Sequence, residues 1–376
     1  MRDATRTVER MPHKHAALAA HVRRLCSCGA DPCIVIPQVV STLREIVGAE
    51  WGMFLFAGKD YQLCDVFSEN SKVYQLFPIY FSKFHNNSKQ KVLGGIDFVT
   101  AMHRGKAFEN SAYFDRMLLN SEMYSELWRP LELRHSLEVT ASDGIRGWGS
   151  VHLQRPPGSR PFSAEHHARI QIFSRHIAHA LTVPVSTPEQ FTEYGLSGVL
   201  VVDEKGVLLF GSADALKIVS LASGGPVEFR SRTQIPDWLV ALVANFNRLW
   251  YGYAAPPCRL TRSNSAGLFQ FRAYRFDVAD RKHGRVAICI HAEHLLPLAL
   301  HVEATGFRLG LSERQRQLCT DLLAGFSYKQ VADRMCTKQS TVVDYTREIY
   351  RKLAIHNRDE LKDRFGPCAI DGRSLY

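Results

Sequence analysis

The stretch that decides the C-terminal fold is "KQSTVVDYTREIYRKLAIHNRDEL", which runs from Lys338 to Leu361. Val342, Ile349 and Leu353, together with Thr346, recur at the spacing of one face of a helix. Val343, Arg347 and Arg351 follow one another at every fourth position and fall on another face. The pattern predicts a basic helix with one inward face, a short break, and a second helix that starts near Asn357.

Two shorter helices are predicted immediately before this stretch. "LSERQRQLCTDLLAG" has Ser312 as its N-cap and Gly325 as its C-terminal stop, and "SYKQVADRM" is capped by Ser327. Two short helices joined by a tight turn, the second of them basic, form a helix-turn-helix. In such a motif the second helix lies in the major groove of DNA.

The residues that we expect to contact DNA gather on this second helix and just before it. Free backbone N–H groups and the helix dipole at its N-terminus suit a phosphate, and Arg347, Arg351 and Lys352 suit further phosphates or a guanine edge. The candidate contacts are Ser327, Lys329, Lys338, Gln339, Ser340, Thr341, Val343, Asp344, Arg347, Arg351 and Lys352. A solvated amphipathic helix that packs only on its own domain would show the same periodicity, because charged helix faces are common.

The amino-acid sequence of this region resembles the LuxR/GerE-type helix-turn-helix of bacterial transcriptional regulators over about 50 residues. The matching positions are Leu311, Ser312, Arg314, Ala324, Gly325, Ser327, Lys329, Val331, Ala332, Ser340, Thr341, Val342, Ile349, Lys352, Leu353, Asn357 and Arg358. The resemblance implies a four-helix DNA-binding domain over residues 311–368. It also implies a dimer through the last helix, 359–365, with one recognition helix in each half-site.

Four positions depart from the family pattern. Gln315 and Gln317 stand where the family usually has acidic residues, and Tyr345 stands where it often has His. Val343 replaces a usual Lys, which removes a base or phosphate contact and offers an apolar group to a thymine methyl instead. The operator sequences of relatives are therefore not carried over to this chain.

The longer front part of the chain predicts two α+β domains. A helix at 33–48, a strand at 51–57 and paired strands at 135–141 and 147–155 make the first, over 33–182. A Pro-containing linker at 183–190 leads to a hairpin around Asp203–Gly206, which opens the second domain at 191–295. Residues 1–32 read as a basic flexible segment, and 296–310 as a second linker. The expected fold class is α+β multidomain with an all-α C-terminal domain.

The two front domains resemble a GAF domain (33–182) and a PAS domain (191–295). Such domains often hold a small ligand or pair two chains, so the resemblance implies a sensor, with simple dimerisation as the alternative. The candidate ligand-binding residues are aromatic: Trp51, Phe54, Phe56, Tyr80, Phe81, Phe84 and Trp148. The same aromatics at this spacing are also typical of a plain hydrophobic core.

Composition agrees with a nucleic-acid partner. The formal net charge is +10, with six Lys and Arg against two Asp and Glu in residues 1–30 and twelve against eight in residues 307–365. Such an excess of positive charge favours polyanionic partners.

The nine Cys show no disulfide framework, and no signal peptide or membrane-spanning stretch is seen, which predicts a cytoplasmic protein. Cys26, Cys28 and Cys33 lie close together near His21, and a zinc site, a redox sensor and an unstructured thiol cluster stay open there.

Enzyme signatures are absent: the sequence holds no G-x-S-x-G, P-loop or H-E-x-x-H motif. We expect no catalytic residue, no metal and no cofactor. The sequence favours a DNA-binding transcriptional regulator that senses a small ligand or partner and binds operator DNA as a dimer. RNA polymerase is a further candidate partner, and no membrane is involved. The alternative is an interaction protein whose helical tail binds another regulator, with little DNA binding.

Overall fold

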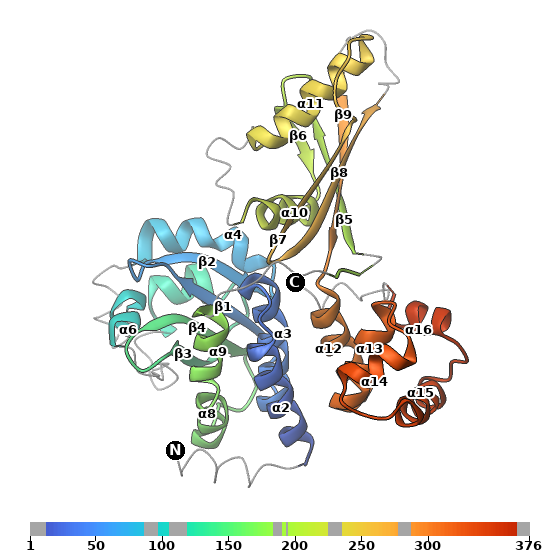
Figure 1. The fold of residues 1–376 in the computed structure, drawn as a ribbon. Helices are drawn as coiled ribbons and strands as arrows, with labels where there is room; N and C mark the ends of the chain where they lie inside the picture. The colour runs from blue at the N-terminus through green and yellow to red at the C-terminus, as the bar shows by residue number, and fades with distance from the viewer. Residues whose placement is uncertain are drawn as a thin grey trace. The chain divides into compact units, whose positions relative to one another are not determined.

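The computed structural model describes residues 13–85, 97–104, 119–182, 190–192, 195–224, 235–276 and 287–366. The chain divides into two compact units, the first ending at Pro184 and the second running from Val185 to Cys368. The first unit holds one antiparallel sheet. The second holds another antiparallel sheet followed by a group of helices (Figure 1). The linker predicted at 183–190 falls almost entirely outside the described residues.

The first unit is built on four strands in the order β2-β1-β4-β3, in which every neighbouring pair is antiparallel. The strands are β1 (Trp51–Ala57), β2 (Leu63–Ser68), β3 (His135–Ser142) and β4 (Gly147–Arg155). Helices α3 (Pro32–Val47) and α9 (Ser174–Thr182) pack on one face of this sheet (Figure 1). Helix α8 (Ala164–Gln171) precedes α9 and is capped by Ser163, whose hydroxyl accepts from the His166 N–H group.

The other face of this sheet lies under short helical segments. These are α4 (Lys72–Ile79), the π-helical turn η1 (Tyr80–Phe84), α6 (Phe98–Arg104) and the π-helical turn η3 (Tyr124–Trp128). Side chains alternate between the two faces along each strand. Phe54 is fully buried on the side of α3 and α9, whereas its neighbours Met53 and Leu55 face α4 and α6.

The prediction that residues 1–32 form a flexible segment is wrong for 13–27. These residues form helix α2 (His13–Ser27), which packs against α3 and α9. Leu18, Val22 and Leu25 are buried along one side of this helix. The basic composition hid the stripe, because Arg23 and Arg24 interrupt it in sequence while lying on the outer side of the helix in space.

The second unit begins with five antiparallel strands in the order β6-β5-β9-β8-β7. They are β5 (Leu196–Val202), β6 (Leu208–Gly211), β7 (Arg259–Asn264), β8 (Gly267–Phe276) and β9 (Ala287–Leu295). Helices α10 (Ala213–Ser223) and α11 (Asp237–Trp250) contact the sheet. Phe269, Phe271, Ile288 and Ile290 are fully buried in its core. The hairpin predicted around Asp203–Gly206 is confirmed by the pairing of β5 with β6.

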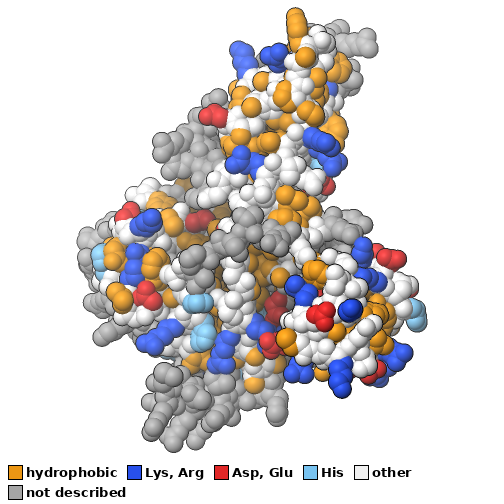
Figure 2. Space-filling model, in the orientation of Figure 1, with side chains coloured by type: hydrophobic (Ala, Val, Ile, Leu, Met, Phe, Trp, Pro, Cys, Tyr) orange, Lys and Arg blue, Asp and Glu red, His pale blue; other side chains and the backbone are white. Residues whose placement is uncertain are grey.

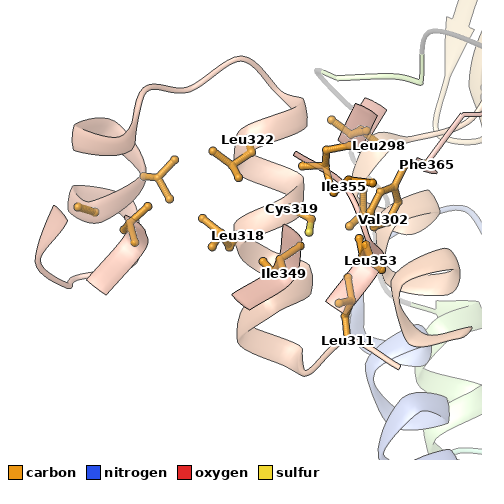
Figure 3. Packing of buried hydrophobic residues seen from close by; sticks show 14 residues of the cluster. Leu298, Val302, Leu311, Leu318, Cys319, Leu322, Ile349, Leu353, Ile355 and Phe365 are labelled. Atoms are coloured by element: carbon orange, nitrogen blue, oxygen red, sulfur yellow. The ribbon is translucent and has the colours of Figure 1, made fainter. Parts of the chain in front are cut away.

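The helices that follow form one hydrophobic cluster. They are α12 (Leu298–Arg308), α13 (Glu313–Leu323), α14 (Tyr328–Arg334), α15 (Gln339–Leu353) and α16 (Arg358–Arg364). The linker predicted at 296–310 is therefore wrong, since 298–308 are helical. Leu298 and Val302 of α12 join the same core as Leu318, Ile349 and Phe365 (Figure 3). The compact C-terminal region thus has five helices, one more than the four predicted.

Helix α15 ends at a residue whose backbone conformation is strained. Ala354 adopts a left-handed conformation with φ 53°, and the Ile355 N–H group donates to the Tyr350 carbonyl. This arrangement usually carries glycine, because a Cβ is crowded there. We expect Ala354→Gly to raise the free energy of unfolding by about 0.5–1 kcal/mol.

Urea unfolding of the fragment 296–376, whose buried core lies between Leu298 and Phe365, measures this change. Ala324→Gly is the matched control, because Ala324 ends α13 in a right-handed conformation. Glycine should give no gain at that position. An equal effect of the two substitutions would show that strain at Ala354 is not what the glycine relieves.

Candidate nucleic-acid interface

The core of the C-terminal helices fixes which side of α15 faces outward. Val342, Thr346, Ile349 and Leu353 are all buried, and the Thr346 hydroxyl donates to the Val342 carbonyl at 2.8 Å. The inward stripe predicted from the sequence is thereby confirmed. Because these residues turn one side of α15 toward α13 and α14, the opposite side is left to solvent.

The outward side carries a stripe of polar residues at helical spacing. Ser340, Asp344, Arg347 and Arg351 are all exposed. Asp344 and Arg347 form an exposed ion pair, with 3.6 Å between the carboxylate Oδ1 and the guanidinium Nη1, and the two side chains are 74% and 77% exposed. An ion pair this exposed contributes little to stability, so Arg347 can exchange it for another anion at small cost.

Helix α15 begins after a short turn whose own N–H groups are already hydrogen-bonded, that of Cys336 to the Asp333 carbonyl and that of Thr337 to the Ala332 carbonyl. Met335, Cys336 and Thr337 separate α14 from Lys338, and Cys336 adopts a left-handed conformation with φ 50°. Lys338 is the N-cap residue of α15 and makes no side-chain capping hydrogen bond. The first N–H groups of α15 therefore have no side-chain cap from Lys338 and suit a phosphate oxygen.

The eleven predicted contacts fall into three groups. Lys329, Lys338, Gln339, Ser340, Asp344, Arg347 and Arg351 are exposed, and Thr341 and Val343 are half-buried. Ser327 and Lys352 have partners within the domain. The Ser327 hydroxyl caps α14 by accepting from the Gln330 N–H group, and the Lys352 ammonium donates to the Gly310 carbonyl. Because its ammonium group is held by this carbonyl, Lys352 is a weaker candidate for phosphate contact than the four exposed basic residues.

One residue that the sequence-based prediction omitted joins this surface. Arg314, exposed in the first turn of α13, lies 3.5 Å from the Tyr345 hydroxyl of α15 through its Nη1. No local signal marks this pair, since only the packing of α13 on α15 brings the two residues together. Figure 2 shows Lys and Arg side chains, with acidic side chains among them, on the side of the domain where α15 lies.

Two Arg side chains connect α16 and α14 to the C-terminal end of α13 and the loop after it. Arg358 of α16 donates to the carbonyls of Leu322 and Phe326. Arg334 of α14 pairs with the buried carboxylate of Asp321, with 2.9 Å between Nε and Oδ1, and its guanidinium lies 4.5 Å from the ring centre of Phe326. These contacts fix the loop between α13 and α14, and through it the start of the motif.

The seven aromatic residues predicted to bind a ligand do not meet at one site, although Tyr80 lies next to Phe81 and packs against the cluster of Phe84. Phe54 is fully buried on the face of β1 opposite Met53, and its ring lies 4.7 Å from that of Phe56. The Trp148 indole N–H group donates to Asp143 at 2.9 Å. Phe81 is exposed, whereas Trp51 and Phe84 belong to separate core clusters. Of the seven, only Tyr80 borders the cavity that the first unit contains.

That cavity lies between the first sheet and the helical segments α4, η1, α6 and η3 and has a volume of about 170 Å³. Apolar side chains such as Leu55, Phe77 and Trp128 form its walls, and polar side chains of β3 and β4 form its floor. The sequence-based prediction missed this floor because its residues are polar, and only the alternation along two paired strands places them on one buried face.

The cysteine group near the N-terminus is divided between two environments. Cys26 is buried in α2, and burial raises the pKa of its thiol to about 12, whereas Cys28 is exposed. A thiol with so high a pKa is a poor metal ligand and a poor redox sensor. Within the described ranges, no set of three His, Cys, Asp or Glu residues could hold a metal ion, and no helix is long and apolar enough to cross a bilayer.

The C-terminal helices match a known family. Residues 309–364 match the family of bacterial regulatory proteins called the luxR family, or GerE. This segment is a LuxR-type helix-turn-helix domain, which confirms the resemblance seen in the sequence.

Among solved structures, the chain is similar to a phage VqmA–DPO complex with 17% identity, covering 46% of this chain and 87% of that chain at a TM-score of 0.19. A VqmA dimer of Vibrio cholerae, described with LuxR-type receptors, shows 15% identity over 45% of this chain and 81% of that chain at a TM-score of 0.17. The sensor region of a sensor histidine kinase shows 16% identity over 42% and 63%, at a TM-score of 0.19. No curated protein matches the chain.

Proposed function

We propose that this protein is a transcriptional regulator that places α15 in the major groove of operator DNA. The observation that supports this best is the outward stripe of α15, which takes no part in the core and carries Arg347 and Arg351. Each guanidinium has the reach and fork geometry to contact a guanine edge or a phosphate. Lys338 and Lys329 flank the stripe and suit the phosphates on either side.

Asp344 adds selectivity to this surface. A carboxylate in the groove repels phosphates but accepts a hydrogen bond from a cytosine amino group. Its exposed ion pair with Arg347 keeps the carboxylate and the guanidinium on the same part of the outward stripe. Val343, half-buried beside the stripe, offers an apolar contact to a thymine methyl.

We also propose that the protein acts as a dimer on two half-sites about 34 Å apart, one helical turn of DNA. In α16, Leu361 and Phe365 are buried in the domain's own core, so the free side of this helix is largely polar. A dimer contact through α16 alone would therefore have little apolar area. For this reason we assign part of the pairing to the front domains, GAF-like over 33–182 and PAS-like over 191–295.

The alternative function is a helical tail that binds another regulator instead of DNA. Asp344 and Glu348 on the exposed part of α15 favour it, because acidic groups weaken contact with phosphates. The dependence of binding on salt separates the two, since binding to DNA releases counterions and binding to a protein surface of mixed charge does not do so to the same extent.

We expect a steep dependence of DNA affinity on salt. Lys329, Lys338, Arg347 and Arg351 are exposed candidates for phosphate contact in each chain. If half of them engage in a dimer, log affinity should fall against log salt with a slope of roughly −4. Fluorescence anisotropy with genomic fragments over a range of KCl concentrations measures this slope. A slope near zero, or no binding to any fragment of its own genome, would rule out the DNA-binding function.

A further inference from the structure

The floor of the cavity in the first unit is a polar sheet face that is buried. Glu138 of β3 stands opposite His152 of β4, and Ser136 stands opposite Gln154. Thr140 and Ser150 make the next row. The side chains of four of these residues are buried, with exposed fractions between 1% and 7%: Ser136, Thr140, Ser150 and Gln154. A sheet face that only supported a core would carry apolar residues here, since burying polar groups costs free energy unless they are hydrogen-bonded.

Most of these polar groups satisfy one another in a chain of contacts along the floor. The Ser136 hydroxyl donates to Glu138 Oε1 at 3.0 Å, and the same oxygen lies 3.3 Å from His152 Nδ1. On the other side of the ring, His152 Nε2 lies 2.7 Å from Ser150 Oγ. Glu138 and His152 therefore hold each other in place.

Gln154 is the exception. It is 1% exposed and lines the cavity, and its Oε1 atom has no hydrogen-bond partner among the described residues. A buried acceptor that is left without a hydrogen bond costs free energy, because it has lost its contact with water. A molecule in the cavity that presents an N–H or O–H group to this oxygen would remove that cost.

Size and charge restrict the molecule further. The cavity of about 170 Å³ is close to the cavity volumes of roughly 150 Å³ that hold a benzene ring. Its walls include the rings of Phe77, Tyr80 and Trp128, and none of the described lining residues is Lys or Arg to neutralise an anion. We infer that this cavity binds a small, uncharged, single-ring molecule whose hydrogen-bond donor meets Gln154.

The row Ser150–His152–Glu138 also has the order of a nucleophile, a base and an orienting carboxylate. Acyl transfer would further need N–H donors aimed at an oxyanion beside Ser150. Strand β4 pairs with β1 on one side and β3 on the other, so the N–H groups next to Ser150 serve the sheet ladder. The geometry points to recognition of a ligand and not to hydrolysis.

This inference rests on the proposal that the front of the chain senses a ligand, but its test needs no DNA. Benzyl alcohol, toluene, benzylamine and benzoate form a matched series of neutral donor, apolar, cationic and anionic probes. Calorimetric titration of the full-length protein should give benzyl alcohol a dissociation constant of about 1 mM, as expected for a ligand of this size. Toluene should bind more weakly, and the charged probes should not bind measurably.

Two variants locate the site. Gln154→Leu should weaken benzyl alcohol about 5–10-fold and leave toluene unchanged, because it removes one hydrogen bond and keeps the cavity. Ala101→Phe fills the cavity from α6 and should abolish both. Ile145→Phe, at a position 84% exposed, is the control and should bind like the parent.

The inference is overturned if benzyl alcohol does not bind at about 10 mM, if Ala101→Phe binds it like the parent, or if benzylamine or benzoate binds more tightly. It is also overturned if Gln154→Leu binds benzyl alcohol like the parent. Failure of DNA binding in a separate salt titration would remove the regulator function and leave these results unchanged. The two proposals therefore fail separately.

Discussion

Replacing Arg347 and Arg351 together by alanine should reduce affinity for operator DNA at least about 100-fold without changing the stability of the fold. Both side chains lie on the outward stripe of α15, and the only ion pair that Arg347 makes among the described residues is the exposed one with Asp344. Each guanidinium that contacts a base edge contributes about 1–3 kcal/mol, and each that contacts a phosphate adds about one unit to the salt slope. Anisotropy titrations on the same fragment, together with thermal unfolding, measure both effects.

The control removes a positive charge of the same kind from another side of the domain. Arg364 is exposed on α16, away from the outward stripe, and Arg364→Ala should lower affinity less than about threefold. Replacing Arg347 by lysine separates the two kinds of contact, because lysine keeps the charge but loses the fork that reads guanine. If the double alanine variant and the Arg364 variant lose equal affinity, α15 is not the reading helix.

The sequence predicted the inward and outward sides of α15 because local information determines them. The spacing of Val342, Thr346, Ile349 and Leu353 gives the inward side of α15, and the outward side follows from helical geometry alone. Capping residues such as Ser312 and Ser327 likewise act within one turn of their own helix. The local sequence could not predict which charged side chains find partners elsewhere in the folded chain. Lys352 binds a carbonyl 42 residues before it, and no short-range pattern indicates that contact.

The cavity shows the opposite case. The sequence predicts aromatic residues at the ligand site. The floor of the cavity is instead made of polar residues from two strands that pair only in the folded chain. Phe54 and Phe56 belong to the predicted ligand-binding set, yet alternation along β1 turns them toward α3 and α9, away from the cavity. The alternation along a strand predicts which residues share one face of the sheet. It does not predict which face borders a cavity, because that depends on how the helices cover each face.

Helix α12 was missed for a related reason, and it leads to the second large expected effect. Its sequence, "LALHVEATGFR", contains Thr and Gly near its end, which lower helix propensity. Gly306 is needed there, because a Cβ at this position would lie 2.8 Å from Cγ of Arg316. Close approach of α12 to α13, rather than propensity, therefore explains this part of the helix.

We expect the fragment 305–376 to be largely unfolded and the fragment 296–376 to fold. The shorter fragment loses Leu298 and Val302, each contributing about 1.5–3 kcal/mol by burial. It also loses Glu303, whose carboxylate lies 2.7 Å from Nε of Arg316, a side chain 4% exposed. A buried arginine without its partner costs about 3–5 kcal/mol. The sum is comparable to the whole stability of about 4–10 kcal/mol expected for a domain of this size. Far-UV circular dichroism and urea unfolding of the two fragments measure the difference.

A point variant tests the same contact without removing a helix. In the fragment 296–376, Glu303→Ala should lower the free energy of unfolding by about 3–5 kcal/mol, because Arg316 stays buried among Leu311, Phe307 and Gly306 after its carboxylate is gone. Glu348→Ala removes an exposed carboxylate from α15 and should change stability by less than about 0.5 kcal/mol. If the two variants are equally stable, or if the two fragments fold equally well, α12 only connects the second sheet to the DNA-binding helices and does not stabilise them. If Glu303→Ala gives the larger loss of stability, α12 is instead a structural part of the DNA-binding domain. A movement of α12 caused by a change in the second sheet would then also displace α13, because Glu303 and Arg316 form a buried pair between the two helices. Helix α15 packs on α13 and would be displaced with it.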